Sequence, residues 1–304
     1  MAWSTFRIGG DLEVRRLGFG AMRLPTGPGT GTRQASLAVA RRAVELGVTL
    51  IDTAHMYGWG ANEELLAEAL HPYPDELVIT TKVGVARSAS TGEWGLDGRP
   101  DVLRGQVEQG LRRLRAERIE LLQLHRIDPE VPLADQLGAL RELQIQGKVG
   151  RIGLSEVSAA ELEQARGLID VASVQNRYSL LHREHEPVLA ACEAAGIAFL
   201  PWQPVAGAVS ATRATSGATA TATVTTETAA AAAAAAVTAA LASVAAELEA
   251  TPAQVALAWL LGRSPVILPI PGTARVDHLE ENVAAAQLRL SPAHQDRLDR
   301  LSPP

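Results

Sequence analysis

The sequence predicts an α/β fold, namely a (β/α)8 TIM barrel with an N-terminal β-hairpin. Three observations support this prediction. Short apolar segments rich in β-branched residues alternate with longer amphipathic stretches, eight such segments occur, and the chain of 304 residues is 47% hydrophobic. Repeated strand–helix units build a parallel sheet, and eight of them are what a closed barrel requires. We therefore expect residues 1–304 to form a single domain.

The hairpin is the first expected element. Two short alternating segments, TFRI and LEVR, flank a turn at Gly9, Gly10 and Asp11, and glycines are favoured where a tight hairpin turn needs a positive φ.

Eight strands are expected after the hairpin, each short, apolar and followed by a helical pattern. They begin at Leu17, Val48, Leu77, Ile119, Val149, Val171, Ile197 and Val266. Two of the intervening helices show boundary signals. The helix over 33–47 ends at Gly47 as a C-cap, and Asp101 is expected to cap the helix over 101–114.

One segment departs from this pattern. Residues 210–240 consist almost entirely of alanine and threonine, so they contribute few large side chains to a core. We expect 210–228 to be a flexible low-complexity loop after the seventh strand, and the run Ala229–Ala236 to open the seventh helix.

Composition excludes several classes of protein. A net charge of −6 gives no broad attraction to nucleic acid or anionic lipid, so neither nucleic acid nor a membrane is an expected partner. The first residues lack the basic and apolar regions of a signal peptide, which favours the cytoplasm. Cys192 is the only cysteine, so an internal disulfide and a CxxC metal site are excluded, and no metal is expected. The oligomeric state stays open.

Four residues suggest proton-transfer chemistry: Asp52, Tyr57, Lys82 and His125. A tyrosine has an ordinary pKa of about 10 and needs a nearby ammonium to favour the phenolate near neutrality. Lys82 can supply that charge, Asp52 can hold the lysine in place, and His125 can hydrogen-bond the oxygen that receives the proton. This combination suits the reduction of a carbonyl group.

Each of these residues also has a structural explanation when taken alone. Asp52 could cap a strand, Lys82 could be a solvated charge, and His125 could be a core histidine. However, Asp52, Lys82 and His125 all close expected strands, and Tyr57 follows in the loop after one of them. Catalytic groups of such barrels lie where strands end, so joint occurrence favours the catalytic interpretation.

The chain resembles the aldo-keto reductase family in several motifs that occur in the right order. These are LGFGAMRL, GVTLIDTAHMYG, TTKVG, LLQLHRID, GKVGRIGLSEVS, SVQNRYSLLHRE and PIPGTARVDHLEENV. The phrases HPYPDEL and IAFLPWQP also resemble the bacterial branch that includes pyridoxal reductases. The resemblance implies an NADPH-dependent reductase of an aldehyde, with pyridoxal as the first candidate. It further implies that Tyr57 donates the proton while Lys82 lowers the tyrosine pKa and His125 orients the carbonyl.

The resemblance also implies a set of cofactor contacts. The nicotinamide carboxamide would meet Ser155 and Gln175, with Glu156 and Asn176 as further candidates, and Trp202 would stack on the ring. The remaining contacts would follow the pyrophosphate, the adenosine 2′-phosphate and the adenine, and they are Gln203, Gly207, Gly272, Thr273, Arg275 and Asn282. Arg275 would carry most of the positive charge at the 2′-phosphate, at a helix N-terminus.

Substrate contacts and other functions are less restricted by the sequence. Met22, Trp59 and Trp94 could wall the substrate pocket, although Trp59 could equally pack one loop against another. A second function is a nucleotide-sensing subunit of the potassium-channel β type. A third is a lyase in which Lys82 forms a Schiff base, but pairing with Asp52 would keep that lysine protonated and poorly nucleophilic.

Overall fold

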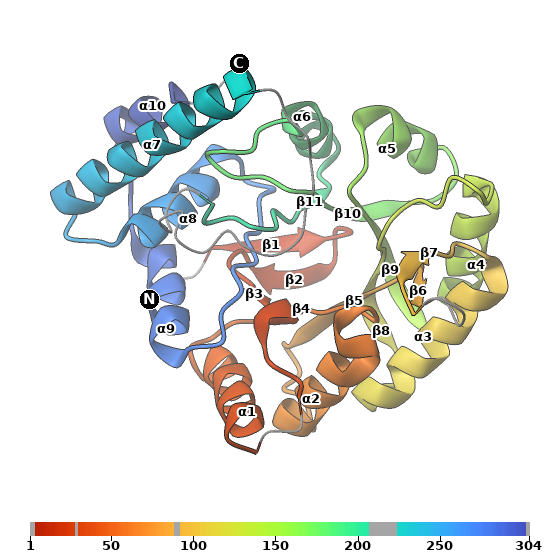
Figure 1. The fold of residues 1–304 in the computed structure, drawn as a ribbon. Coiled ribbons are helices and arrows are strands. Elements are labelled where there is room, and N and C mark those ends of the chain that lie inside the picture. Colours follow the sequence, from red (N-terminus) through yellow and green to blue (C-terminus); the bar gives the residue numbers. More distant parts are fainter. Residues whose placement is uncertain (1–3, 28–29, 88–91, 207–223, 302–304) are drawn as a thin grey trace.

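The protein forms a curled parallel sheet surrounded by helices, as a computed structural model shows for residues 4–27, 30–87, 92–206 and 224–301 (Figure 1). The strands are β1 (Thr5–Ile8), β2 (Leu12–Arg15), β3 (Phe19–Gly20), β4 (Leu50–Asp52), β5 (Val78–Val83), β6 (Val85–Arg87), β7 (Trp94–Leu96), β8 (Ile119–Leu124), β9 (Val149–Ser155), β10 (Val171–Gln175) and β11 (Ala198–Phe199).

The helices lie mainly between consecutive strands and form the outer layer. They are α1 (Thr30–Glu45), α2 (Ala61–Leu70), α3 (Pro100–Leu114), α4 (Leu133–Ile145), α5 (Ala159–Arg166), α6 (Glu186–Ala195), α7 (Val224–Glu247), α8 (Pro252–Arg263), α9 (Val276–Ala284) and α10 (Pro292–Asp299), with 3-10 turns η1 (Ala21–Arg23), η2 (Tyr57–Gly60) and η4 (Ala285–Gln287).

The predicted barrel is confirmed, with one correction to its strands. Seven strands pair in the order β11-β10-β9-β8-β5-β4-β3, all in parallel. The expected eighth strand from Val266 is an extended segment with a single β-bridge, from Ile267 to Phe199. Pro269 and Pro271 lack N–H groups and interrupt a regular ladder. Their carbonyl oxygens still accept hydrogen bonds from the N–H groups of Gly18 and Gly20, at β3, over 2.9 and 3.1 Å.

The predicted hairpin is confirmed as β1 and β2, and it closes one end of this barrel. It crosses the centre of the view in Figure 1. Ile8 and Val14 are buried with Leu50, Val78 and Leu121, which belong to the beginning and middle of their strands. The hairpin does not cover the opposite end, where the strands finish, and this is where a functional site is expected.

Two other boundary predictions need correction. Asp101 does not cap α3, because the N-cap is Arg99 and Pro100 occupies the first turn, where its fixed φ suits a helix start. Helix α7 begins at Val224, so the last five residues of the predicted loop 210–228 are helical. The remainder of that loop, residues 210–223, lies outside the described residues. Alanine-rich sequence evidently carries the helix further back than the threonines suggest.

No single helix in the described ranges is long and apolar enough to cross a bilayer. Helices α7 and α8 reach that length and hydropathy only as a pair, across a 94° bend.

Candidate active site

The polar residues at the ends of the strands surround a buried ion pair between Lys82 and Asp52. The Lys82 ammonium donates to both Asp52 carboxylate oxygens at 2.7 Å and to the Thr53 carbonyl at 2.8 Å. Their side chains are 0% and 4% exposed, respectively. Burial lowers the pKa of Lys82, but the Asp52 carboxylate and Tyr57 outweigh it, so this pKa lies above its ordinary value. Lys82 is therefore a fixed positive charge.

Two glutamine side chains inside the barrel also donate hydrogen bonds to Asp52. Gln175 donates to Asp52 Oδ1 at 2.8 Å, and Gln123 donates to the same oxygen at 3.3 Å and to Thr80 Oγ1 at 3.0 Å. Both glutamines are buried. Gln175, expected at a nicotinamide carboxamide, thus belongs to the hydrogen-bond network of the ion pair in this structure.

Tyr57 begins the turn η2 and lies against the ion pair. Its ring centroid is 5.1 Å from Lys82 Nζ, and it meets the His125 ring edge-on at 6.2 Å. Burial raises the pKa of Tyr57 above its ordinary value, while Lys82 acts in the opposite direction. The prediction that Lys82 depresses the tyrosine pKa therefore holds for its own contribution but not for the net shift. The hydroxyl keeps its proton at neutral pH.

His125 follows β8 and is buried beside Tyr57. Burial lowers its pKa to about 2, and the positive charges of Lys82 and Arg126 add to the effect. The imidazole is neutral at physiological pH and can donate or accept a hydrogen bond. Within the described residues its Nδ1 has no hydrogen-bond partner, and an unsatisfied buried polar atom of this kind is unusual outside functional sites.

The loop that carries Tyr57 has an uncommon backbone. Gly58, Trp59 and Gly60 all have positive φ, at 59°, 56° and 97°. A positive φ is unfavourable for a bulky side chain such as tryptophan, and such conformations persist only where surrounding contacts hold them. The Trp59 ring meets the His55 ring edge-on at 6.2 Å, and the Arg87 guanidinium lies 5.9 Å from the centre of its ring.

Arg113 of α3 supports this loop through a contact with His55. It contacts His55 Nδ1 at 3.1 Å, the buried Glu63 carboxylate at 3.3 Å and Gln109 at 3.2 Å. Because arginine only donates, His55 Nδ1 is the acceptor. Burial lowers the pKa of His55 to about 4, with Arg113 contributing, so this histidine is neutral as well.

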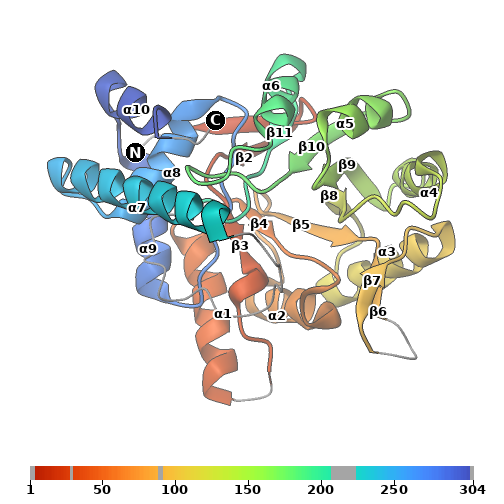
Figure 2. The same ribbon diagram turned by 45° about the horizontal axis from the view of Figure 1, so that its top comes forward.

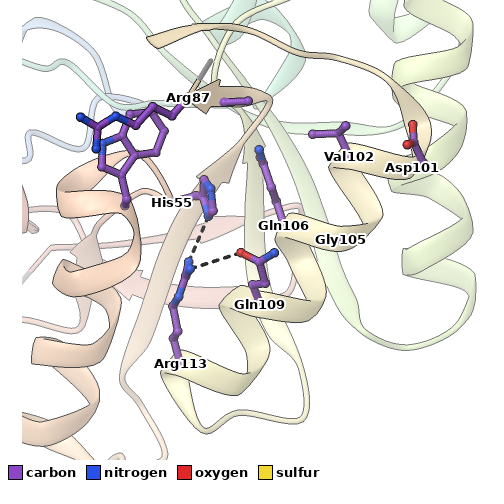
Figure 3. A pocket seen from close by; sticks show the side chains of 10 residues that line it. His55, Arg87, Asp101, Val102, Gly105, Gln106, Gln109 and Arg113 are labelled. Atoms are coloured by element: carbon purple, nitrogen blue, oxygen red, sulfur yellow. Dashed lines mark hydrogen bonds between the residues drawn. The ribbon is translucent and has the colours of Figure 1, made fainter. Parts of the chain in front are cut away.

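A cavity of about 570 Å³ lies between this loop, strand β6 and α3 (Figure 3). It is lined by His55, Trp59, Ala86, Arg87, Asp101, Val102, Gly105, Gln106, Gln109 and Arg113. Of the proposed substrate residues only Trp59 borders it. Met22 and Trp94 are 56% and 60% exposed, and Trp94 lies on the antiparallel ribbon β6–β7 that projects from the barrel in Figure 2. The three residues thus do not line one cavity here.

The expected nicotinamide residues lie at neighbouring strand ends. Ser155 ends β9 and accepts a hydrogen bond from Arg126 at 3.1 Å. Trp202 lies three residues beyond β11 rather than at its end, and its indole N–H donates to Glu156. Asn176 is fully buried and bonds the backbone of Val157, which is a structural role.

The loop after β11 is described only in part. Gln203 has a φ of 52°, a left-handed conformation that is uncommon for a residue other than glycine. Gly207 lies outside the described residues.

Two of the residues expected to contact the adenosine, Thr273 and Arg275, lie at the N-terminus of α9. Thr273 is buried and its hydroxyl accepts from the Arg275 N–H at 3.1 Å. The exposed Arg275 guanidinium pairs with Asp277, a partner that the sequence analysis missed. A cavity of about 520 Å³ borders Arg275, Asp277 and Glu280 and reaches α1. Asn282 is 8% exposed on the same helix.

Gly272 has a second constraint from the barrel itself. A side chain there would bring a Cβ to 2.8 Å from the Gly20 carbonyl oxygen. The close approach of the first and last segments therefore requires glycine at this position, whatever its part in binding.

Sequence reasoning missed two polar residues beside His125. Gln123 lies two residues before it on the same face of the strand, so strand alternation could have identified it. Arg126 follows directly, yet its side chain meets Ser155 of the next strand, which only the strand pairing reveals.

Comparison with known proteins agrees with this architecture. The model of the aldo/keto reductase family matches residues 16–303. An uncharacterized oxidoreductase of Schizosaccharomyces pombe is 42% identical over 95% of this chain and 87% of its own length. Pyridoxine 4-dehydrogenase of Escherichia coli is 37% identical over 99% of both chains. An aldo-keto reductase of Klebsiella pneumoniae, solved in complex with NADPH, superposes with a TM-score of 0.79 at 26% identity, covering all of this chain and 96% of that one.

Proposed function

Because the chain belongs to the aldo/keto reductase family, we propose that it reduces an aldehyde or ketone to an alcohol with NADPH, and that Tyr57 is the proton donor. The observation that carries this proposal is the Tyr57 ring beside the Lys82 ammonium, which Asp52 fixes in place. Pyridoxal is the first candidate substrate, supported by the identity to the E. coli enzyme. A single domain and a cytoplasmic location are part of the same proposal.

The residues at the barrel mouth fit a nicotinamide dinucleotide. The Ser155 hydroxyl and the Gln175 amide lie on adjacent strands, and the buried Nδ1 of His125 has no hydrogen-bond partner in the described ranges. The cavity at the start of α9 offers Arg275 to a phosphate, as expected at a helix N-terminus. When bound, the cofactor supplies the hydride.

The protein supplies the proton and the orientation. Burial keeps the Tyr57 proton in place until the carbonyl oxygen gains negative charge, and Lys82 then stabilises the phenolate that remains. Neutral His125 can donate a hydrogen bond to the same oxygen without competing as an acid. Asp52, held by Gln175 and Gln123, keeps the lysine charge from moving.

The test combines binding and turnover. The purified protein is titrated with NADPH and with NADH by fluorescence, and the nicotinamide absorbance is then followed with pyridoxal and a panel of small aldehydes. We expect the protein to bind NADPH tightly. We also expect at least one aldehyde to be reduced, with oxidation of the bound NADPH. The Tyr57→Phe variant should bind NADPH normally but lose about 10²- to 10⁴-fold in turnover, the usual contribution of a general acid.

Three outcomes would count against the proposal. Unchanged turnover in Tyr57→Phe would remove Tyr57 as the acid. Binding without turnover on any carbonyl would favour a nucleotide-binding subunit, and absence of binding would reject the cofactor.

A further inference from the structure

Arg126 is a half-buried cation at the mouth of the barrel that the proposed mechanism does not use. It follows His125 directly. Its Nη1 donates to the His125 carbonyl at 2.6 Å and to the Ser155 hydroxyl at 3.1 Å. These two contacts fix the guanidinium between the ends of β8 and β9, next to the residues expected to meet the carbonyl group and the nicotinamide.

The charge of Arg126 has no carboxylate partner in the described part of the chain. Lys82 and Arg113, which are also near this site, each form an ion pair, but none joins Arg126 to an acidic side chain. Glu156, the acidic residue that influences it electrostatically, accepts instead from the Arg177 N–H and the Trp202 indole. Holding an unpaired charge partly away from water is costly, and an anionic ligand would offset this cost.

The guanidinium also has N–H groups that form no hydrogen bond with the described residues. Arginine carries five N–H groups in a planar fork, and the two hydrogen bonds of Arg126 among described residues both use Nη1. Nε and Nη2 form the edge that matches the two oxygens of a carboxylate. Neither nitrogen is among the buried atoms that lack a partner, so this edge is open to an incoming group.

We propose that Arg126 recognises a carboxylate on the substrate, so that the preferred substrates are aldehydes bearing a single negative charge. This inference rests on the proposed reductase function, and it places aldehydes that bear one carboxylate above aldehydes without one, such as pyridoxal, in order of preference. The Lys82–Asp52 pair is neutral overall and His125 is uncharged. Arg126 therefore adds a net positive charge next to His125 and Ser155.

The electrostatics favour a carboxylate over a phosphate. A phosphate monoester carries about −1.5 to −2 charges at neutral pH, which exceeds the single charge of Arg126. The nearby Glu156 carboxylate repels either anion, and it repels the more highly charged phosphate more strongly. One guanidinium and one carboxylate, by contrast, neutralise each other with matched geometry.

The test compares matched aldehydes that differ in charge. We expect kcat/KM of the wild type to be about 10- to 100-fold higher for 4-formylbenzoate than for methyl 4-formylbenzoate, the range expected for hydrogen bonds to charged groups. Arg126→Met should bring the ratio close to one, and Arg126→Lys should retain part of it, because lysine keeps the charge but loses the fork. The matched control is Arg7→Met on the hairpin at the opposite end of the barrel, whose side chain is 67% exposed and which should keep the wild-type ratio.

The possible failures can be told apart. Equal kcat/KM for both aldehydes in the wild type would overturn the role of Arg126 while leaving the reductase function intact. An unchanged ratio in Arg126→Met with weaker NADPH binding would overturn it as well, since Arg126 would then position the cofactor through Ser155. Reduction of no aldehyde at all would reject both proposals.

A second measurement does not depend on how the variant folds. Competitive inhibition of the wild type by benzoate and by benzamide should differ by a similar factor, with benzoate stronger. The difference should shrink at high ionic strength, because salt screens partly exposed charges. Equal inhibition by the two compounds would contradict the proposal.

Discussion

At the residue scale, the buried pair of Lys82 and Asp52 shows why single positions in this site depend on their neighbours. Taking two charges out of water costs several kcal/mol per ion, and their attraction offsets this cost only when further hydrogen bonds complete the geometry. The Thr53 carbonyl and the amides of Gln175 and Gln123 provide those bonds. The lysine charge is consequently fixed 5.1 Å from the centre of the Tyr57 ring.

The neutral state of His125 predicts how stability depends on pH. Its pKa is about 2 in the folded protein and about 6.5 when unfolded. Below pH 6.5 the unfolded chain therefore binds more protons, so this contribution to stability is fully present above pH 6.5 and is lost as the pH falls. From His125 alone, the free energy of unfolding should be about 2 kcal/mol lower at pH 5 than at pH 8.

Urea denaturation at these two pH values checks the prediction. The His125→Gln variant should lose about 2 kcal/mol of the pH dependence. His278→Gln, which removes an exposed histidine, is the matched control and should behave like the wild type. Identical pH dependence in all three proteins would show that His125 titrates normally in the folded state.

At the element scale, loops and helix ends hold the side chains that regular strands cannot. The turn η2 presents Tyr57 because Gly58, Trp59 and Gly60 reverse the chain with positive φ, and Arg113 of α3 supports the turn through His55. Helix α9 likewise presents Arg275 at its N-terminus, where backbone N–H groups are also available to a phosphate.

The pairing of Arg275 with Asp277 leads to a prediction about cofactor preference. Arg275→Ala should raise the Kd for NADPH far more than that for NADH, because only NADPH carries the 2′-phosphate. Asp277→Asn should do the opposite and lower the Kd for NADPH, since a bound phosphate no longer competes with the carboxylate that holds Arg275. Fluorescence titration of both variants with both nucleotides measures this. If Arg275→Ala raised the Kd for NADPH and for NADH equally, Arg275 would not contact the 2′-phosphate.

At the scale of the whole molecule, closure of the barrel depends on glycines where the first and last segments meet. Gly18 and Gly20 donate to carbonyl oxygens of the segment from Val266, and Gly272 approaches Gly20 closely. The two prolines that prevent a regular eighth strand leave these few hydrogen bonds to complete the ring.

Gly272→Ala should therefore destabilise the whole fold. A Cβ at 2.8 Å from the Gly20 oxygen must displace backbone, and overpacking of this kind costs about 1–3 kcal/mol. Gly138→Ala in α4 is the matched control, because nothing lies within 4 Å of its added Cβ and alanine favours a helix by up to about 1 kcal/mol. Thermal unfolding should show a lower Tm for the first variant and an equal or higher Tm for the second.

Periodicity and local signals in the sequence determined the fold class, the hairpin and the order of the strands. Alternation of apolar residues fixes which face of a strand is buried, and this property is local. Strand ends predicted Asp52, Lys82 and His125 on one side of the barrel for the same reason. The start of α7 and the cap of α3 were wrong by a few residues, because alanine and proline act on a helix end more strongly than the threonines and the aspartate used to place it.

The tertiary structure alone decided which side chains meet. Arg126 and Ser155 are 29 residues apart, and Gln175 and Asp52 are 123 apart; no local pattern pairs them, because strand register and closure set these contacts. Burial is likewise a property of the folded molecule, and it reverses the expected net shift of the Tyr57 pKa. The sequence thus determined which reactive side chains are present, while the barrel determined their protonation states and their neighbours.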